Sequence, residues 1–130
     1  MPGATFADVR RLTAHLPEVE ESTSYGTPAL KVRGRSFCRL WGEREYRRDG
    51  LHDSEVLVVL CDPALKAVAI ESSAGVLFST PHYEGYGAML VRLADVAEDD
   101  LAGLLEDSYL LRAPASLRRA LDAARRENDP

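Results

Sequence analysis

The amino-acid sequence predicts one globular domain in which helices at both ends enclose a series of short strands. The chain has 130 residues, of which 45% are hydrophobic and 28% are charged, and these values are usual for a single globular domain. Apolar residues recur at helical spacing near both ends, and short apolar runs separated by turn residues fill the middle. Neither a repeat nor a linker divides the chain, so we expect one domain over residues 1–130.

The first helix is predicted to begin after Thr5, because Thr5 and Asp8 have the spacing of a capping box. Its apolar residues follow at intervals of three or four: Phe6, Val9, Leu12 and Leu16. Pro17 then ends the pattern, since proline lacks the amide hydrogen that a helix interior needs.

Three short strands are predicted next, over residues 20–25, 29–32 and 35–41, with Gly26-Thr27-Pro28 as the break between the first two. Arg33-Gly34 predicts a two-residue hairpin loop that pairs Val32 with Arg35. The register continues with Leu30 opposite Phe37. One face would then carry Leu30, Val32, Phe37 and Trp41, and the other Lys31, Ser36 and Cys38.

Asp49-Gly50 is a second hairpin-type signal. Beyond it, residues 55–61 (EVLVVLC) are apolar on both faces, which is typical of a central strand covered on two sides. Asp62 is expected to cap a helix that Pro63 begins and that ends near Gly75.

The last third of the chain is predicted to hold two strands, over residues 76–79 and 88–93, followed by two helices. The strands are joined by the loop TPHYEGYG, residues 80–87, which the sequence indicates is a structured turn. The acidic residues 98–100 suit the first turn of a helix, and Pro114 suits the start of the final one. The inner faces are predicted to be Leu101, Leu104, Leu105 and Ser108 in one helix and Leu117, Ala120, Leu121 and Ala124 in the other.

The charge balance argues against a protein whose whole surface binds nucleic acid, since the net charge is −5 and the isoelectric point is about 5.2. Basic residues nevertheless concentrate in one region: Lys31, Arg33, Arg35, Arg39, Arg44, Arg47 and Arg48. No apolar run is long enough to span a membrane and no signal-peptide pattern is present, so we expect a soluble cytoplasmic protein without a membrane partner. Cys38 and Cys61 are expected to be reduced thiols.

No metal, cofactor or catalytic pattern is apparent. His15, His52 and His82 lie far apart in the sequence, and the cysteines do not supplement them as metal ligands. His82 has only Tyr83 and Tyr86 and one carboxylate nearby, which is no complete catalytic set. The sequence therefore favours a binding protein without a cofactor over an enzyme.

Several short motifs, taken in order, resemble the MmcQ/YjbR-like family of small bacterial proteins. They are residues 24–37 (SYGTPALKVRGRSF), Cys61-Asp62-Pro63, Thr80-Pro81-His82-Tyr83 and Ser108-Tyr109. The resemblance spans nearly the whole chain. It implies an α+β fold, a twisted antiparallel sheet with helices packed mainly on one face, as in the frataxin-like protein CyaY.

The same resemblance implies DNA binding through two hairpins, a "double wing". The first wing would present Lys31, Arg33, Arg35 and Arg39 to phosphates, and the second would present Tyr83 and Tyr86 for stacking. This second loop carries Glu84-Gly85 where better-known members carry lysines, so it lacks positive charge.

The alternative is a module that binds a small ligand or a protein in a pocket between the Tyr25–Pro28 turn and the Thr80–Tyr86 loop. Its predicted lining is Tyr25, Thr27, Pro28, His82, Tyr83 and Tyr86. The expected partner is therefore DNA, a small molecule or, under this alternative, a protein, and the sequence leaves the oligomeric state open.

Overall fold

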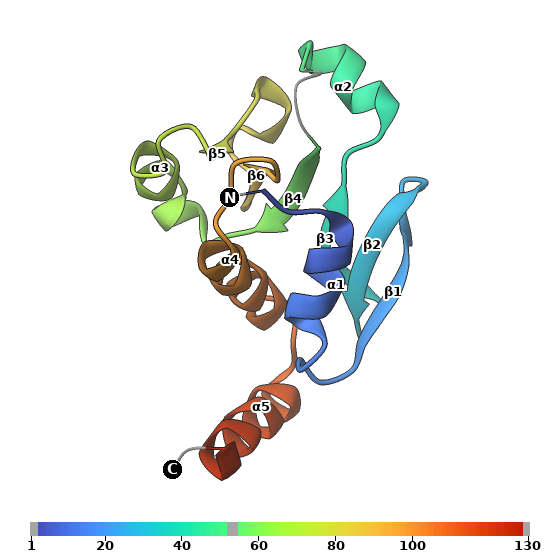
Figure 1. The fold of residues 1–130 in the computed structure, drawn as a ribbon, viewed down its shortest axis with the longest axis vertical. Coiled ribbons are helices and arrows are strands. Elements are labelled where there is room, and N and C mark those ends of the chain that lie inside the picture. Colours follow the sequence, from blue (N-terminus) through green and yellow to red (C-terminus); the bar gives the residue numbers. More distant parts are fainter. Residues whose placement is uncertain (1–2, 52–54, 129–130) are drawn as a thin grey trace.

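A computed structural model of the chain describes residues 3–51 and 55–128 and has an α+β fold built on a six-stranded antiparallel sheet (Figure 1). The strands are ordered β1-β2-β3-β4-β6-β5, and every neighbouring pair is antiparallel. The elements are α1 (Phe6–Thr13), β1 (Val19–Ser24), β2 (Thr27–Val32), β3 (Arg35–Leu40), α2 (Glu43–Asp49), β4 (Val56–Leu60), α3 (Pro63–Glu71), β5 (Leu77–Phe78), a short 3₁₀ helix (Pro81–Tyr83), β6 (Ala88–Arg92), α4 (Glu98–Leu110) and α5 (Ala115–Asn128). The predicted α+β class and antiparallel sheet are confirmed, whereas the likeness to CyaY stays a prediction.

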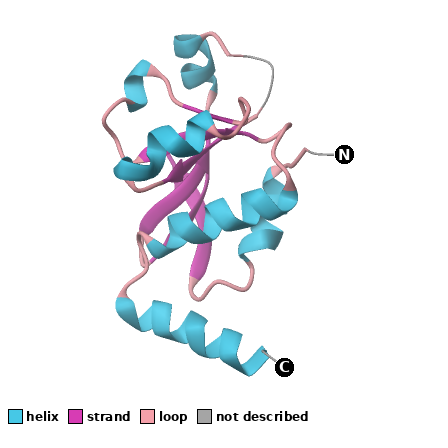
Figure 2. Cartoon of the chain, turned by 90° about the vertical axis from the view of Figure 1, so that its left-hand side faces the viewer, coloured by secondary structure: helices cyan, strands magenta, loops and turns pink. Residues whose placement is uncertain are grey.

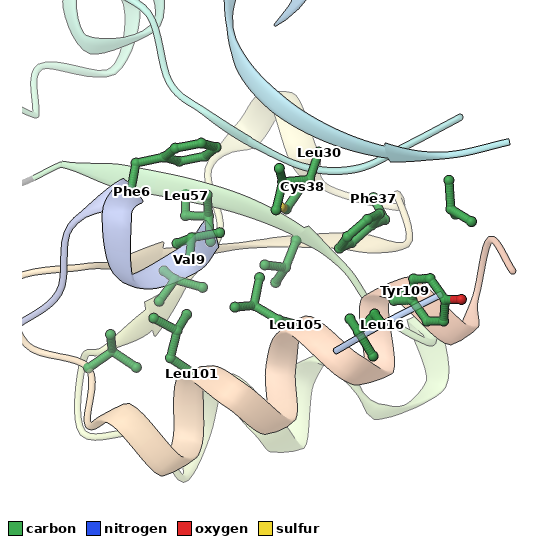
Figure 3. Packing of buried hydrophobic residues seen from close by; sticks show 14 of the residues in the cluster. Phe6, Val9, Leu16, Leu30, Phe37, Cys38, Leu57, Leu101, Leu105 and Tyr109 are labelled. Carbon is green, nitrogen blue, oxygen red and sulfur yellow. The ribbon is translucent and has the colours of Figure 1, made fainter. Parts of the chain in front are cut away.

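The main core lies between one face of the sheet and the helices α1 and α4 (Figure 3). Its fully buried side chains include Val9, Phe37, Leu57, Leu101, Leu105 and Tyr109. The ring of Phe37 meets that of Tyr109 edge-on, with their centroids 5.6 Å apart. The predicted capping box of α1 is present, since the Thr5 amide donates to Asp8 Oδ2 at 2.9 Å.

Two-residue turns join the first three strands. Arg33-Gly34 forms the turn of the predicted hairpin, and both residues have the positive φ that a type I′ turn requires. The first turn differs from the prediction, because it consists of Tyr25-Gly26 alone, and Thr27 and Pro28 belong to β2. Pro28 is exposed there, opposite Thr23 of β1.

The predicted register between β2 and β3 is correct only near the turn. Val32 pairs with Arg35 as predicted, but a bulge opposite the Leu30–Lys31 step puts Leu30 opposite Cys38 instead of Phe37. The extra residue turns both Phe37 and Cys38 into the main core. The predicted faces are therefore wrong for Cys38, and also for Trp41, whose ring packs on the opposite face of the sheet.

Asp49-Gly50 does not form a hairpin. It ends helix α2, and Gly50 takes the left-handed conformation, φ 67°, that commonly terminates a helix. The helix begins after Gly42, whose amide donates to Glu45 Oε1 at 2.9 Å. A glycine followed three residues later by glutamate could have indicated this start.

β4 is an interior strand covered on both faces, as predicted. Asp62 caps α3 by accepting from the Ala64 amide at 2.9 Å, which also agrees with the prediction. Two apolar residues of that helix, Leu65 and Val68, are exposed nonetheless.

α4 docks where β3 and β4 separate. Ser108 accepts a hydrogen bond from the Leu60 amide and donates to the Phe37 carbonyl oxygen, which links the two strands beyond their last pair. α5 follows and extends beyond the sheet, at the opposite end of the molecule from α2 (Figures 1 and 2). Leu117 and Leu121 are buried as predicted, whereas Ala120 and Ala124 are exposed.

Both cysteines are free thiols, as expected. Burial raises the pKa of Cys38 to about 12, so this thiol is inert at neutral pH. Cys61 is half-buried, and burial also raises its pKa. Among the described residues, no helix has both the length and the apolar character needed to cross a membrane.

Candidate functional site

The candidate site lies on the face of the sheet opposite the main core. A second apolar cluster on this face is formed by Trp41, Val56, Val58, Tyr83, Ala88 and Leu90. Tyr46 of α2 packs against it, with its ring 5.4 Å from that of Trp41, and its hydroxyl accepts from the Val56 amide at 2.9 Å. Helix α2 and the loop of residues 80–87 therefore cover only part of this face.

A cleft of about 810 Å³ opens beside this cluster. The Tyr25–Thr27 segment lines one part of it, and His82 and Tyr83 line another. Arg44 and Arg48 of α2 contribute to the remaining wall. We call this space the Tyr25 cleft, and it is the place where the two segments predicted to form a pocket come together.

Tyr25 is the most exposed aromatic side chain at the cleft. It is 90% exposed, although its turn gives it a positive φ of 54°, a conformation that favours glycine or asparagine over tyrosine. The Arg39 guanidinium lies over the ring at 5.0 Å from the centroid, a cation–π contact. The ring is thus held in place while it remains open to solvent.

A hydrogen-bonded network forms the polar floor of the cleft. Arg39 makes a two-pronged ion pair with Glu45, and only 13% of each side chain is exposed. The hydroxyl of Tyr83 donates to Glu45 at 3.4 Å and accepts from Trp41 Nε1 at 3.2 Å. Tyr83 therefore joins the ion pair to the apolar cluster beneath it.

This network shifts the pKa values of its two charged members. Burial alone would raise the pKa of Glu45, but the hydrogen bonds from Arg39 and from the Gly42 amide outweigh it, and the pKa is lowered. Burial would lower the pKa of Arg39, yet the hydrogen bonds and the charge of Glu45 raise it overall. Both groups are therefore charged at neutral pH.

Lys66 fixes the loop of residues 80–87. Its ammonium group donates to the carbonyl oxygens of Tyr83, at 2.6 Å, and Tyr86, at 3.2 Å. Gly87 lies close to the segment before α3, since a Cβ there would be 2.9 Å from the Cys61 carbonyl oxygen. The loop is a structured turn, as the sequence indicates, although sequence reasoning did not identify Lys66.

Not all of the predicted pocket residues line the cleft. Tyr25, Thr27, His82 and Tyr83 do, whereas Pro28 and Tyr86 do not. His82 is exposed and packs its ring against those of Tyr83, at 5.1 Å, and Tyr86, at 6.5 Å. Tyr83 is only 7% exposed, so it supports the floor and cannot stack on a nucleic-acid base as the second wing requires.

The predicted basic hairpin is partly neutralised. Arg33 makes a two-pronged ion pair with Glu18, at 2.7 and 2.9 Å, and Arg39 forms an ion pair with Glu45. Lys31 and Arg35 have no ion-pair partner within residues 3–51 and 55–128. Only these two of the four predicted phosphate contacts are therefore uncompensated.

No three histidine, cysteine or carboxylate side chains gather closely enough to hold a metal ion in the described part of the chain. His15 lies 3.8 Å from Glu106, and neither residue lines the Tyr25 cleft. His52 lies outside the described residues.

Comparison with protein families shows to which family the chain belongs. The sequence model of the YjbR family matches residues 14–111, from the segment before β1 to the end of α4. The chain belongs to the YjbR family. The match includes both segments that line the Tyr25 cleft, so the cleft lies within the part of the chain that the YjbR model matches.

Similar proteins are found in several bacteria. Uncharacterized proteins of Mycobacterium tuberculosis and Mycobacterium bovis are 33% identical over 131 residues, covering 90% of this chain and 95% of theirs. Among solved structures, a Deinococcus radiodurans protein with a DUF419 domain has a TM-score of 0.69, 22% identity, and coverage of 94% of this chain and 91% of its own. A Pseudomonas syringae protein has a TM-score of 0.67, 11% identity, and coverage of 85% and 100%. At these identities the structural matches show the fold alone.

Proposed function

We propose that this YjbR chain is a binding protein that holds a small ring-bearing molecule in the Tyr25 cleft. The observation that carries the proposal is the exposed Tyr25 ring, placed by Arg39 at a cleft of ligand size. An exposed tyrosine offers a large stacking surface at a low cost in conformational entropy. A ligand ring would lie against it.

The backbone at Tyr25 supports the same role. A tyrosine at φ 54° is disfavoured relative to asparagine or glycine, and strained residues are often found at binding sites. The ring therefore lies at the cleft on a turn position that glycine or asparagine would suit better.

The charge of the cleft favours a ligand with an acidic group. Arg44 has no ion-pair partner among the described residues, while Arg48 forms an ion pair with Asp49 at 2.9 Å. Glu43 is already paired with Arg47 and Glu45 with Arg39. The uncompensated charge at the cleft wall is therefore positive.

A thermal-shift titration with benzoate, indole-3-acetate, adenosine and uridine tests the proposal. A ligand at a hundred times its dissociation constant stabilises the fold by about 2.7 kcal/mol, which raises the melting temperature by several degrees. Tyr25→Asn removes the ring but suits the positive φ, so it should abolish the shift without disrupting the turn. Tyr86→Ala, outside the cleft, is the matched control and should retain it. The absence of a shift with every probe, or an equal shift in Tyr25→Asn, would overturn the proposal.

DNA binding is the second candidate function. The observation in its favour is that Lys31 and Arg35 have no ion-pair partner among the described residues, while Tyr86 is 63% exposed and available for stacking. Such binding would rest on few phosphate contacts, because Arg33 and Arg39 are paired with carboxylates.

Fluorescence anisotropy with labelled duplex and single-stranded DNA, at low and at physiological salt, tests this candidate. DNA binding predicts an affinity that falls as salt rises and that weakens on all sequences alike in Arg35→Ala. Arg119→Ala, an exposed arginine of α5, controls for the loss of one positive charge. If low salt produces no binding, or if both variants weaken it equally, the DNA assignment fails.

We also infer that the chain acts in the cytoplasm. Cys38 and Cys61 are both free thiols, which is usual in a reducing compartment. Fractionation of cells that express the tagged chain checks this, and recovery from the periplasm or the medium would contradict it.

A further inference from the structure

A second depression, of about 370 Å³, lies directly beside the Tyr25 cleft, and the proposed function does not use it. The two spaces share Tyr25, Arg39 and Val58 in their walls. The Tyr25 ring therefore borders both spaces, and a ligand ring against it would lie next to the second. We call the second space the Arg112 depression.

The depression has a strongly cationic lining. Arg35, Arg39 and Arg112 all contribute to it, and none of its lining residues carries a carboxylate. Glu45 compensates Arg39 from the neighbouring cleft, but Arg35 and Arg112 have no ion-pair partner within the described residues. Ser24 and Ser36 also line it, although the Ser36 hydroxyl donates to the Cys38 carbonyl oxygen at 3.3 Å. Two guanidinium groups without ion-pair partners suit an oxyanion.

The Arg112 side chain has an unused hydrogen-bond donor. Its Nε atom is buried and has no hydrogen-bond partner in the described part of the chain. A buried donor without an acceptor costs free energy, and more so when the group is charged. An anion in the depression would accept from guanidinium groups there and offset that cost.

The fold places Arg112 at this position. Ser108 fixes the C-terminal part of α4 at the gap between β3 and β4, through Phe37 and Leu60. Arg112 follows one turn later, with its amide donating to the Tyr109 carbonyl oxygen at 2.9 Å. The segment that follows α4 thus brings a cation to β3.

We propose that the Arg112 depression binds a phosphate monoester, so that the ligand of the Tyr25 cleft is a ring-bearing phosphate of the nucleoside 5′-monophosphate type. This inference rests on the proposed function, since the ring must occupy the Tyr25 cleft. Phosphate with three terminal oxygens matches two guanidinium groups better than a single carboxylate does. The same chemistry is present in a free nucleotide and at the 5′-phosphorylated end of a nucleic-acid strand.

The test compares the four ribonucleoside 5′-monophosphates with their nucleosides, using the fluorescence of Trp41, the single tryptophan, which donates to Tyr83 at the cleft floor. Wild-type protein should bind at least one monophosphate at least about tenfold more tightly than its nucleoside, because a tenfold difference, about 1.4 kcal/mol, needs no more than one charge-assisted hydrogen bond. Because Arg35 remains, Arg112→Met should weaken monophosphate binding by about tenfold and leave nucleoside affinity unchanged. Arg119→Met, on exposed α5, is the matched control and should change neither.

The possible outcomes separate the two proposals. Equal affinity for nucleoside and monophosphate in wild-type protein overturns the phosphate inference while the cleft proposal stands. An equal loss of both ligands in Arg112→Met also overturns it, because Arg112 would then not act on phosphate. If neither ligand binds, the nucleotide class is wrong. The cleft proposal then fails too only if the ring-bearing acids are also without effect.

The source of the phosphate is distinguished by a second pair of probes. An eight-nucleotide single strand with a 5′-phosphate is compared with the same strand ending in a 5′-hydroxyl. If the site takes strand ends, the phosphorylated strand binds more tightly and competes with the free monophosphate. If it takes free nucleotides, the two strands bind alike and the preference for free monophosphate over nucleoside alone supports the inference.

Discussion

Arg39 and Glu45 form a two-pronged ion pair, at the end of β3 and the start of α2, with 13% of each side chain exposed. The pair holds the floor of the Tyr25 cleft, because Arg39 also lies over the ring of Tyr25 and Glu45 accepts from Tyr83. The cleft is therefore organised by one buried interaction, and several consequences can be measured.

Glu45→Gln should destabilise the fold by about 3 kcal/mol. Glutamine keeps the hydrogen-bonding shape at the start of α2 but leaves the half-buried Arg39 charge uncompensated, and removing one partner of a buried pair has that order of cost. Urea unfolding measures it. Glu43→Gln, in the same helix, breaks an exposed pair with Arg47 and should cost less than about 0.5 kcal/mol. Equal costs in the two variants would contradict the structural role of the Arg39–Glu45 pair.

The stabilisation from Glu45 should depend on pH. Its pKa in the folded chain lies below the ordinary value of 4.5, so folding favours the charged form. The contribution is complete above that ordinary value and is lost as the pH falls below 4.5 through the folded pKa. The stability difference between wild type and Glu45→Gln should therefore be constant from pH 7 to 5 and shrink in more acidic solution. A difference that grows on acidification would contradict this sign.

Lys66→Met should loosen the loop of residues 80–87. The substitution removes hydrogen bonds from a charged donor to the carbonyl oxygens of Tyr83 and Tyr86, at a cost of about 1 to 3 kcal/mol. Amide hydrogen exchange should become faster within the loop. Lys31→Met removes a lysine without an ion-pair partner in the described residues, and the loop should then exchange as in wild type. Unchanged exchange in Lys66→Met would show that other contacts order the loop.

Gly87→Ala should destabilise the protein by about 1 to 3 kcal/mol. The new Cβ would lie 2.9 Å from the Cys61 carbonyl oxygen, so β6 and the segment before α3 must move apart. Gly103→Ala is the control, and the expected change in stability has the opposite sign. Apart from its chain neighbours and its own helix backbone, no described atom lies within 4 Å of a Cβ at this helical position, and alanine there should stabilise by about 0.5 to 1 kcal/mol. Thermal unfolding of both variants checks the pair, and a neutral Gly87→Ala would contradict the close approach.

The parts of the fold that local chemistry determines could be predicted from the sequence. Arg33-Gly34 acts as a turn, and Asp62-Pro63 starts a helix, because each depends on neighbouring backbone groups alone. The bulge opposite Leu30 could not be predicted, since it depends on the packing of Phe37 against Tyr109 from α4. Asp49-Gly50 was misinterpreted because the same dipeptide suits a hairpin turn and a helix end.

The candidate site shows the same division. The sequence alone placed Tyr25 and His82 at one pocket, and both line the Tyr25 cleft. The burial of Tyr83 and the pairing of Arg39 were not predicted, because Glu45 lies on the unrecognised helix α2. Arg112 comes from a segment far along the chain, and only the tertiary fold brings it to β3.

The most direct measurement for the central claim is an amide-shift titration of the ¹⁵N-labelled protein with nucleoside 5′-monophosphates and with the ring-bearing acids. If the Tyr25 cleft is the binding site, saturable shifts should gather at residues 24–27, 39–48 and 82–83, and Tyr25→Asn should abolish them. Residues 63–71 of α3 serve as the internal reference and should not shift. Saturable shifts centred on α3 or α4, or no saturable shift with any of these ligands, would contradict the assignment of this cleft.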